Sequence, residues 1–222
     1  KDEGLQRKRK LKKRRAMGPT LGMPTQAQYA NHVWTYDFIE DRTERGGKLR
    51  MLCVLDEYTR QCHHIRVDRS IGAVKVVASL EWLFLLHVAP AYIRSDNGSE
   101  LVAKALQDWL LEQGTKTIYI TPGSPWENPY IESFHDKLRD ECLNMHVFTD
   151  GRHAQQVVEG WRNEYNDERP HSSLNYMTPA EFAEYCRNSG RLTSALADAA
   201  SLRSGNRNAP LTEANTLTQV GT

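Results

Sequence analysis

Three short apolar runs near the start of the chain predict three β-strands. Residues 33–39 (VWTYDFI), 49–55 (LRMLCVL) and 62–67 are rich in β-branched or aromatic residues. Gly46-Gly47 and the residues 58–60 separate these runs as turns. Because the connections are this short, we expect the three strands to pair as an antiparallel meander.

Further along the chain, the spacing of apolar residues changes. Residues 71–87 are apolar on nearly every side, which predicts a largely buried helix. The segments that follow are expected to be a strand at 91–94, a helix at 101–110, a strand at 116–120, a helix after Pro129 and a helix at about 150–166. This βββαβαβ order followed by helices predicts an α/β fold with a mixed five-stranded sheet flanked by helices, and the ribonuclease-H-like fold fits it best.

The net charge of +1 hides an uneven distribution of charge. Residues 1–15 carry nine Lys or Arg against two acidic residues, which gives +7, and the remainder, with 20 basic and 26 acidic residues, is about −6. We interpret residues 1–28 as a basic arm and linker that a polyanion such as DNA would attract, with Arg14 and Arg15 as candidate contacts. A solvated tail or a localisation signal is the alternative interpretation.

Residues 187–222 contain no aromatic residue and are rich in Ser, Thr, Asn, Ala and Gly, so we expect a disordered tail. No apolar run approaches the roughly 20 residues that cross a bilayer, and the start does not resemble a secretory signal. The four cysteines show no CxxC spacing. These features predict a cytoplasmic protein with reduced thiols, and they argue against a zinc ribbon or a disulfide framework.

Three acidic residues stand where a cation site would need them. Asp37 lies inside an apolar strand, where an ionised side chain is costly unless something compensates it. Asp96 directly follows a short strand, and Glu132 lies near the start of a helix. Convergent carboxylates suit Mg²⁺, and two such ions can activate an attacking oxygen and stabilise a leaving oxygen. Other acids near strand ends are alternatives, and Asp56 is the most plausible ligand among Glu40, Asp41 and Asp56.

The spacing and surroundings of these acids resemble a known family. Asp96 and Glu132 have 35 residues between them, as in the D,D-35-E arrangement of retroviral-type integrases and related transposases. The chain also resembles the insertion-sequence-three type of transposase, over residues 29–186, in three blocks: SDNG at 95–98, GSPWEN…ESF..KLR.E at 123–141 and YN..RPH..L…TP.EF at 165–182.

The resemblance implies the catalytic core of a DNA transposase, which cleaves phosphodiester bonds and transfers DNA strands. It implies that Asp37, Asp96 and Glu132 form the catalytic triad and hold two Mg²⁺ ions, for which Mn²⁺ can substitute. It further implies DNA as the partner, at element ends and target, and a homodimer or higher oligomer on DNA in the bacterial nucleoid. The basic arm would then connect the core to an N-terminal DNA-binding region missing from this chain.

Several residues near this triad are candidate DNA contacts or supporting residues. Arg139 and His135 share a helix face with Glu132, and His135 would border the site. An Asn97-Gly98 turn would fix the direction of Asp96. The candidate DNA contacts are Arg139, Lys137, Asn128, Trp126, Arg169, Arg14 and Arg15. Solvated charges, a packing Trp or helix capping would explain the same residues without DNA.

Two other classes of protein remain possible from the residues alone. One is a domesticated or truncated DNA-binding protein that keeps the fold without catalysis, although such a module has no use for three converging acids. The other is a ribonuclease H or junction resolvase, which shares the fold and the metals but gives no reason for the block at residues 165–182.

Overall fold

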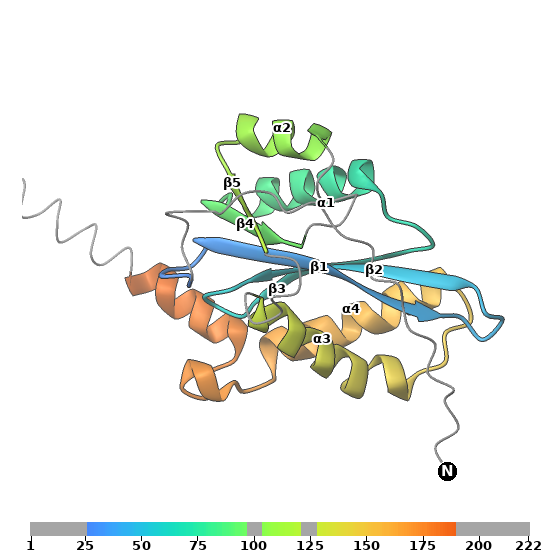
Figure 1. Ribbon diagram of the computed structural model, residues 1–222. Coiled ribbons are helices and arrows are strands. Elements are labelled where there is room, and N and C mark those ends of the chain that lie inside the picture. The colour runs from blue at the N-terminus through green and yellow to red at the C-terminus, as the bar shows by residue number, and fades with distance from the viewer. Residues whose placement is uncertain (1–25, 97–103, 121–127, 190–222) are drawn as a thin grey trace, which may run out of the picture. The chain divides into compact units, whose positions relative to one another are not determined.

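The computed structural model describes residues 26–96, 104–120 and 128–189, and its centre is a mixed five-stranded sheet (Figure 1). The strands are β1 (Val33–Arg42), β2 (Lys48–Asp56), β3 (Cys62–Asp68), β4 (Tyr92–Ser95) and β5 (Lys116–Tyr119). They lie in the order β3-β2-β1-β4-β5. β1, β2 and β3 pair antiparallel, as the short turns predicted, whereas β4 and β5 run parallel to β1.

Helices cover both faces of this sheet (Figure 1). α1 (Ala73–Leu86) and α2 (Lys104–Glu112) lie on one face, and α3 (Pro129–Glu141) and α4 (Gly151–Asp167) on the other. Short 3₁₀ helices follow at Leu143–Met145 and Ser172–Leu174. Among the described residues, no helix is long and apolar enough to span a membrane.

The chain divides into two units, Lys1–Ala183 and Glu184–Thr222. The sheet and α1 to α4 belong to the first unit, which ends in helical residues 179–183. The described part of the second unit, residues 184–189, is helical as well. Residues 1–25 of the predicted arm and residues 190–222 of the predicted tail lie outside the described residues.

Side chains along the strands alternate between two separate cores. Trp34 of β1 is fully buried beneath α1 and α2. Cys53 and Leu55 of β2 belong to the core beneath α3 and α4. Thr35 and Asp37 are the ladder partners of Leu55 and Cys53, so they face α3 and α4 too. The same sheet face is therefore apolar on β2, whereas on β1 it carries the polar residues Thr35 and Asp37 beside the apolar Ile39.

α1 is not largely buried, so the sequence prediction for this helix was wrong. Val76, Leu80 and Leu83 are buried against the sheet. Val74 and Leu85, in contrast, are 84% and 85% exposed. Apolar residues on all sides predict burial only if something covers both sides of a helix, and within the described chain nothing covers the outer side of these two residues.

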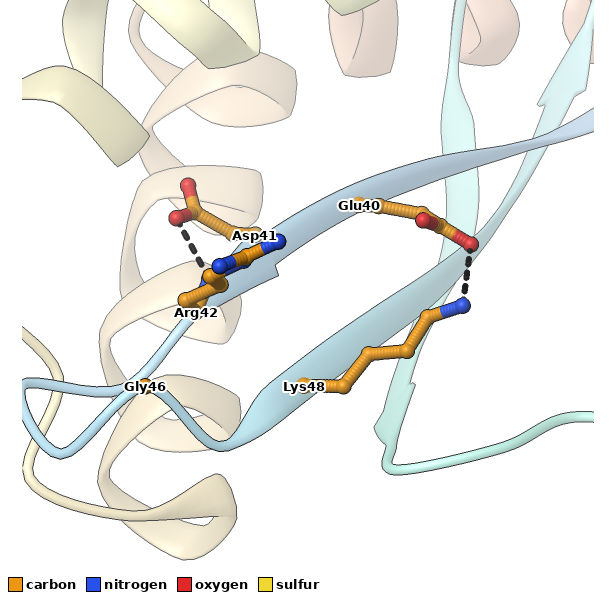
Figure 2. Close-up of a pocket in the computed structure, with 5 residues that line it drawn as sticks. All are labelled: Glu40, Asp41, Arg42, Gly46 and Lys48. Atoms are coloured by element: carbon orange, nitrogen blue, oxygen red, sulfur yellow. Dashed lines mark hydrogen bonds and ion pairs between the residues drawn. The ribbon is translucent and has the colours of Figure 1, made fainter.

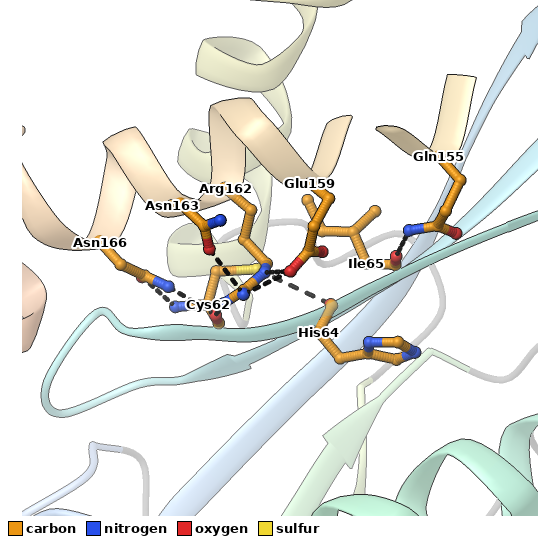
Figure 3. Close-up of polar contacts among 8 residues, drawn as sticks. All are labelled: Cys62, His64, Ile65, Gln155, Glu159, Arg162, Asn163 and Asn166. Carbon is orange, nitrogen blue, oxygen red and sulfur yellow. Dashed lines mark hydrogen bonds and ion pairs between the residues drawn. The ribbon is translucent and has the colours of Figure 1, made fainter. Parts of the chain in front are cut away.

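The free edge of β3 is covered by side chains of α4 (Figure 3). Asn166 accepts a hydrogen bond from the N–H of Cys62 at 2.9 Å and donates one to its carbonyl oxygen at 2.9 Å. Gln155 accepts from the N–H of Val67 at 2.8 Å and donates to the carbonyl of Ile65 at 2.9 Å. Unpaired strand edges tend to pair with other chains, so α4 both packs on the sheet and closes this edge.

Candidate active site

Asp37 lies in the middle of β1, on the face that α3 and α4 cover. Its side chain is 32% exposed, and its Oδ1 accepts a hydrogen bond from the N–H of Phe38 at 2.7 Å. Burial raises the pKa of Asp37 to about 6, and the negative charges of Asp96 and Glu132 add to this rise. Asp96 and Glu132 therefore lie near enough to Asp37 for their charges to act on its carboxyl group.

Two other elements bring Asp96 and Glu132 to Asp37. Thr35 and Arg94 are partners in the parallel β1–β4 ladder, and Asp37 and Asp96 each follow this pair by two residues. Since side chains alternate along a strand, both acids point to the same face of the sheet. Glu132 lies in the first turn of α3, which packs against β1.

This donor set fits a hard divalent cation, because carboxylate oxygens are the ligands that Mg²⁺ prefers. In the described parts of the chain, no three His, Cys, Asp or Glu side chains are yet close enough to hold one ion. Like charges without a cation push one another apart. A bound cation would remove that repulsion and draw the carboxylates together.

The imidazole ring of His135 lies next to the carboxylate of Asp37. Its Nδ1 is 3.9 Å from Oδ2 of Asp37. Burial lowers the pKa of His135 to about 4, and the positive charge of Arg139 contributes. The imidazole is therefore neutral near pH 7, so the contact is not an ion pair at that pH. A neutral ring brings no positive charge that would compete with a metal ion for Asp37.

The guanidinium of Arg139 is hydrogen-bonded to residues near the C-terminal end of β1. Its guanidinium donates to Oδ2 of Asp41 at 2.8 Å and to the carbonyl oxygen of Glu40 at 2.7 Å. The carboxylate of Glu40 forms an ion pair with Lys48 at 2.9 Å. Figure 2 shows Glu40, Asp41 and Lys48 around a pocket of about 360 Å³ beside the β1–β2 hairpin. Both acids of this pocket have basic partners, which makes them poor alternatives to the predicted triad.

Asp56, the other alternative ligand, belongs to a turn. Its side chain is buried and accepts backbone hydrogen bonds from Asn31 at 2.7 Å, Tyr58 at 2.7 Å and Thr59 at 3.2 Å. These bonds occupy both carboxylate oxygens and fix the connection between β2 and β3. The structure therefore assigns Asp56 to folding rather than to a cation site.

Lys137 lies on a different flank of α3 from Glu132. Arg169, which follows α4, contacts that same flank. Lys137 donates to the carbonyl and to the hydroxyl of Ser133 at 3.2 Å and 2.7 Å, and Arg169 forms an ion pair with Glu141. Ser133, Lys137 and Glu141 follow a four-residue spacing, so they share a helix face that is not the face of Glu132. These two predicted DNA contacts are thus separated from the carboxylates.

Five of the predicted site residues cannot be placed. Trp126, Asn97, Gly98, Arg14 and Arg15 lie outside the described residues. Their predicted roles stay predictions.

A buried polar layer beneath the carboxylates was missed by the sequence analysis. The hydroxyl of Thr35 donates to Oδ1 of Asn128 at 2.8 Å, and the Nε of Arg94 donates to Oε1 of Glu57 at 2.7 Å. All four residues are buried. Asn128, a predicted DNA contact, is only 5% exposed and points inward. Polar residues between buried apolar neighbours are the signal that could have identified Thr35 and Arg94.

Comparison with known proteins identifies the family. Two models described as "Integrase core domain" match residues 27–125 and 113–179. A protein of insertion element IS407 from Burkholderia multivorans is 41% identical over 153 residues, which is 69% of this chain and 55% of that protein. A protein of insertion element IS476 from Xanthomonas euvesicatoria is 40% identical, over 69% of this chain and 44% of that protein. The chain thus spans about half the length of these curated relatives.

Solved structures show the same fold at low sequence identity. One is the simian T-cell lymphotropic virus intasome in complex with PP2A regulatory subunit B56 gamma, with a TM-score of 0.59 and 13% identity, over 88% of this chain and 62% of that one. Another is the trimeric form of the HTLV-2 integrase catalytic core domain in complex with magnesium, with a TM-score of 0.57 and 12% identity, over 70% of this chain and 97% of that one. The predicted ribonuclease-H-like fold is confirmed. With the insertion-element relatives, these findings also confirm the resemblance in sequence: the chain belongs to the integrase core family and is similar to proteins of bacterial insertion elements.

Proposed function

We propose that this chain is the catalytic core of a DNA transposase that holds two divalent cations with Asp37, Asp96 and Glu132. The observation that carries the proposal is the placement of the three acids: Asp37 lies on β1, Asp96 directly follows the neighbouring strand β4, and Glu132 lies in the first turn of α3, which packs on β1. The raised pKa of Asp37, caused first by burial and then by the charges of the other two carboxylates, supports it. The repulsion that Asp96 and Glu132 exert on the partly buried Asp37 is a cost to the metal-free fold. A pair of Mg²⁺ ions relieves this cost, and Mn²⁺ accepts the same oxygen ligands.

The bound ions would supply activation of the attacking oxygen and stabilisation of the leaving oxygen in an in-line displacement. Water is the attacking group in cleavage, which frees a 3′-hydroxyl, and this hydroxyl attacks a second strand in joining. Each step breaks one P–O bond and forms another, with no covalent enzyme intermediate. The chain supplies oxygen ligands from β1, from the residue that follows β4 and from α3, and these positions orient the phosphate.

Arg139 is the residue on this side of α3 that would contact a DNA phosphate. Its two hydrogen bonds to the end of β1 leave further N–H donors of the five that a guanidinium carries. It lies seven positions after Glu132, on the same helix face. A phosphate held there would be close to the carboxylates. His135, neutral near pH 7, completes this surface.

The proposal includes DNA ends and target DNA as partners, an assembly of two or more copies on DNA, and action in the bacterial nucleoid. Solved relatives support an assembly, since the HTLV-2 core was described in dimeric and trimeric forms. We assign residues 29–186 to the catalytic core, 1–28 to a basic DNA-binding arm and 187–222 to a tail.

Cleavage and strand transfer on a labelled duplex that carries the element end, with Mg²⁺ or Mn²⁺, test the proposal. Asp96→Asn is expected to lower both rates at least about 100-fold, because it removes a ligand charge. Asp108→Asn, the same change at an exposed position of α2, is the control and leaves both rates unchanged. Full activity of Asp96→Asn would refute the proposed triad. Hydrolysis of an RNA–DNA hybrid instead of strand transfer would indicate a ribonuclease H, and DNA binding without any cleavage would indicate a binding module.

A further inference from the structure

The hydrogen bond between Thr35 and Asn128 connects two of the elements that carry the carboxylates. Thr35 precedes Asp37 by two residues on β1 and faces the same side of the sheet. Asn128 is the N-cap residue of α3, four positions before Glu132. The Oγ1–Oδ1 distance is 2.8 Å, and the two residues are 0% and 5% exposed. A bond between residues 93 positions apart thus joins the strand of one acid to the helix of another.

Asn128 uses its side chain in an unusual way for a residue at a helix start. An Asn at this position commonly accepts a hydrogen bond from an N–H of the first turn. Here the side chain forms no such cap, and its oxygen accepts the hydroxyl of Thr35 instead. Its backbone carbonyl accepts the N–H of Glu132 at 3.4 Å. The oxygen that usually caps a helix therefore anchors this one to the sheet, at the turn that bears Glu132.

Arg139 also joins α3 to β1, through its hydrogen bonds to Asp41 and Glu40, but it lies seven positions after Glu132. Apolar side chains of α3 pack on the sheet as well. Ile131, Phe134 and Leu138 are buried in the core beneath α3 and α4. Apolar packing holds a helix against a sheet, but it has no preferred direction. A buried hydrogen bond depends strongly on distance and angle. It can therefore set how far the first turn advances along β1.

We propose that Thr35 and Asn128 are a positioning pair, which fixes the carboxylate of Glu132 relative to that of Asp37 and so sets the affinity of the site for divalent cations. Neither residue has to contact the metal or the DNA. The inference rests on the proposed function, because it assumes that these acids share cations.

The test uses the full chain and three single variants. Thr35→Val keeps the shape of the side chain and removes the donor, and Thr35→Ser restores the hydroxyl. Thr115→Val is the matched control, since Thr115 is equally buried and its hydroxyl donates to the carbonyl of Pro90 at 2.9 Å, before β5. For each protein, we would measure the free energy of unfolding in urea, Mn²⁺ affinity from the electron paramagnetic resonance signal of the free ion, and amide exchange in the first turn of α3.

We expect Thr35→Val to raise the Mn²⁺ dissociation constant about 10-fold, as is typical when a residue that supports metal ligands is changed. Amide exchange should become faster in the first turn of α3. Thr35→Ser should restore both properties to wild-type values. Thr115→Val should reduce stability to a similar extent as Thr35→Val and leave the Mn²⁺ affinity and the exchange in α3 unchanged.

Two results would overturn the positioning role. One is wild-type Mn²⁺ affinity in folded Thr35→Val, and the other is an equal loss of affinity in Thr115→Val, which would trace the effect to global stability. Failure of the wild-type protein to bind Mn²⁺ would refute the proposed function instead. Amide exchange would still decide the positioning role in that case, because unchanged exchange in Thr35→Val would show that the bond does not hold the first turn of α3.

Discussion

Replacing Asp37 with Asn removes a charge that the metal-free fold disfavours, so we expect this variant to be more stable than the wild type when no divalent cation is present. Asn keeps an oxygen that can accept the hydrogen bond from the N–H of Phe38. The substitution therefore changes the charge and little else. Most substitutions of partly buried residues destabilise a protein, which makes a gain in stability a demanding prediction.

The size of the gain follows from the pKa of Asp37, which rises from 3.8 to about 6 on folding. At a pH above both values, this rise corresponds to about 3 kcal/mol of lost stability. The side chain is 32% exposed, and solvent screening reduces the figure. We expect Asp37→Asn to gain about 1–2 kcal/mol near neutral pH.

The gain should depend on pH in a defined direction. Between pH 3.8 and about 6, the unfolded chain loses the proton of Asp37 before the folded protein does. Wild-type stability therefore falls as the pH rises through this window, relative to the variant. Below pH 3.8 the carboxyl is protonated in both states. The two proteins should then be equally stable.

Urea unfolding, followed through the fluorescence of the five Trp residues, measures these differences. The order of stability should reverse when Mg²⁺ is added, since binding at 100 times the dissociation constant stabilises the wild type by about 2.7 kcal/mol. Asp68→Asn is the control with the opposite sign, because the hydrogen bond from Lys75 lowers the pKa of Asp68. If Asp37→Asn is less stable than the wild type in EDTA at neutral pH, the metal-free fold does not disfavour the charge of Asp37, and neither burial nor the neighbouring carboxylates raise its pKa.

Two further substitutions test the packing that supports the site. Asn166→Ala leaves buried backbone groups of the β3 edge without their side-chain partner, so it should lower the free energy of unfolding by about 2–3 kcal/mol, and a loss near zero would mean that water replaces the amide. Leu83→Ala should cost about 2–5 kcal/mol, whereas Leu85→Ala should change stability by less than about 0.5 kcal/mol. Equal losses in the two Leu variants would show that the outer side of α1 is covered in solution.

The strands and most helices could be predicted because their signals are local. The meander of β1, β2 and β3 followed from three apolar runs, rich in β-branched or aromatic residues, and two short turns. The helix expected at about 150–166 is α4, Gly151–Asp167, and Asp150 caps it by accepting the N–H groups of Arg152 and His153. Exposure of α1 could not be predicted, since an apolar side chain does not reveal whether another element will cover it.

The site could be predicted only in part, for a related reason. Asp37 stood out because an acid inside an apolar strand is costly. Its grouping with Asp96 and Glu132 depended on the family resemblance as well as on spacing. The partners of Thr35 and Arg94 are 93 and 37 positions away, and only the folded sheet brings them together. The separation of Lys137 from the carboxylates likewise depends on which face α3 turns to β1.

The polar side chains on this face of the sheet surround the proposed cation site. Deeper in the fold, Thr35 is hydrogen-bonded to Asn128, and Arg94 forms a buried ion pair with one carboxylate oxygen of Glu57. Toward the surface, Asp37 faces His135, which is neutral near pH 7, while Arg139 is turned to Asp41. Among the described residues, the charge of Arg50 lowers the pKa of Asp37, but burial and the neighbouring carboxylates outweigh it, and the pKa stays high. A fold selected for stability alone would place a basic or an apolar residue at position 37. The destabilisation that the charge of Asp37 causes in the metal-free protein is therefore best explained by a ligand that carries positive charge.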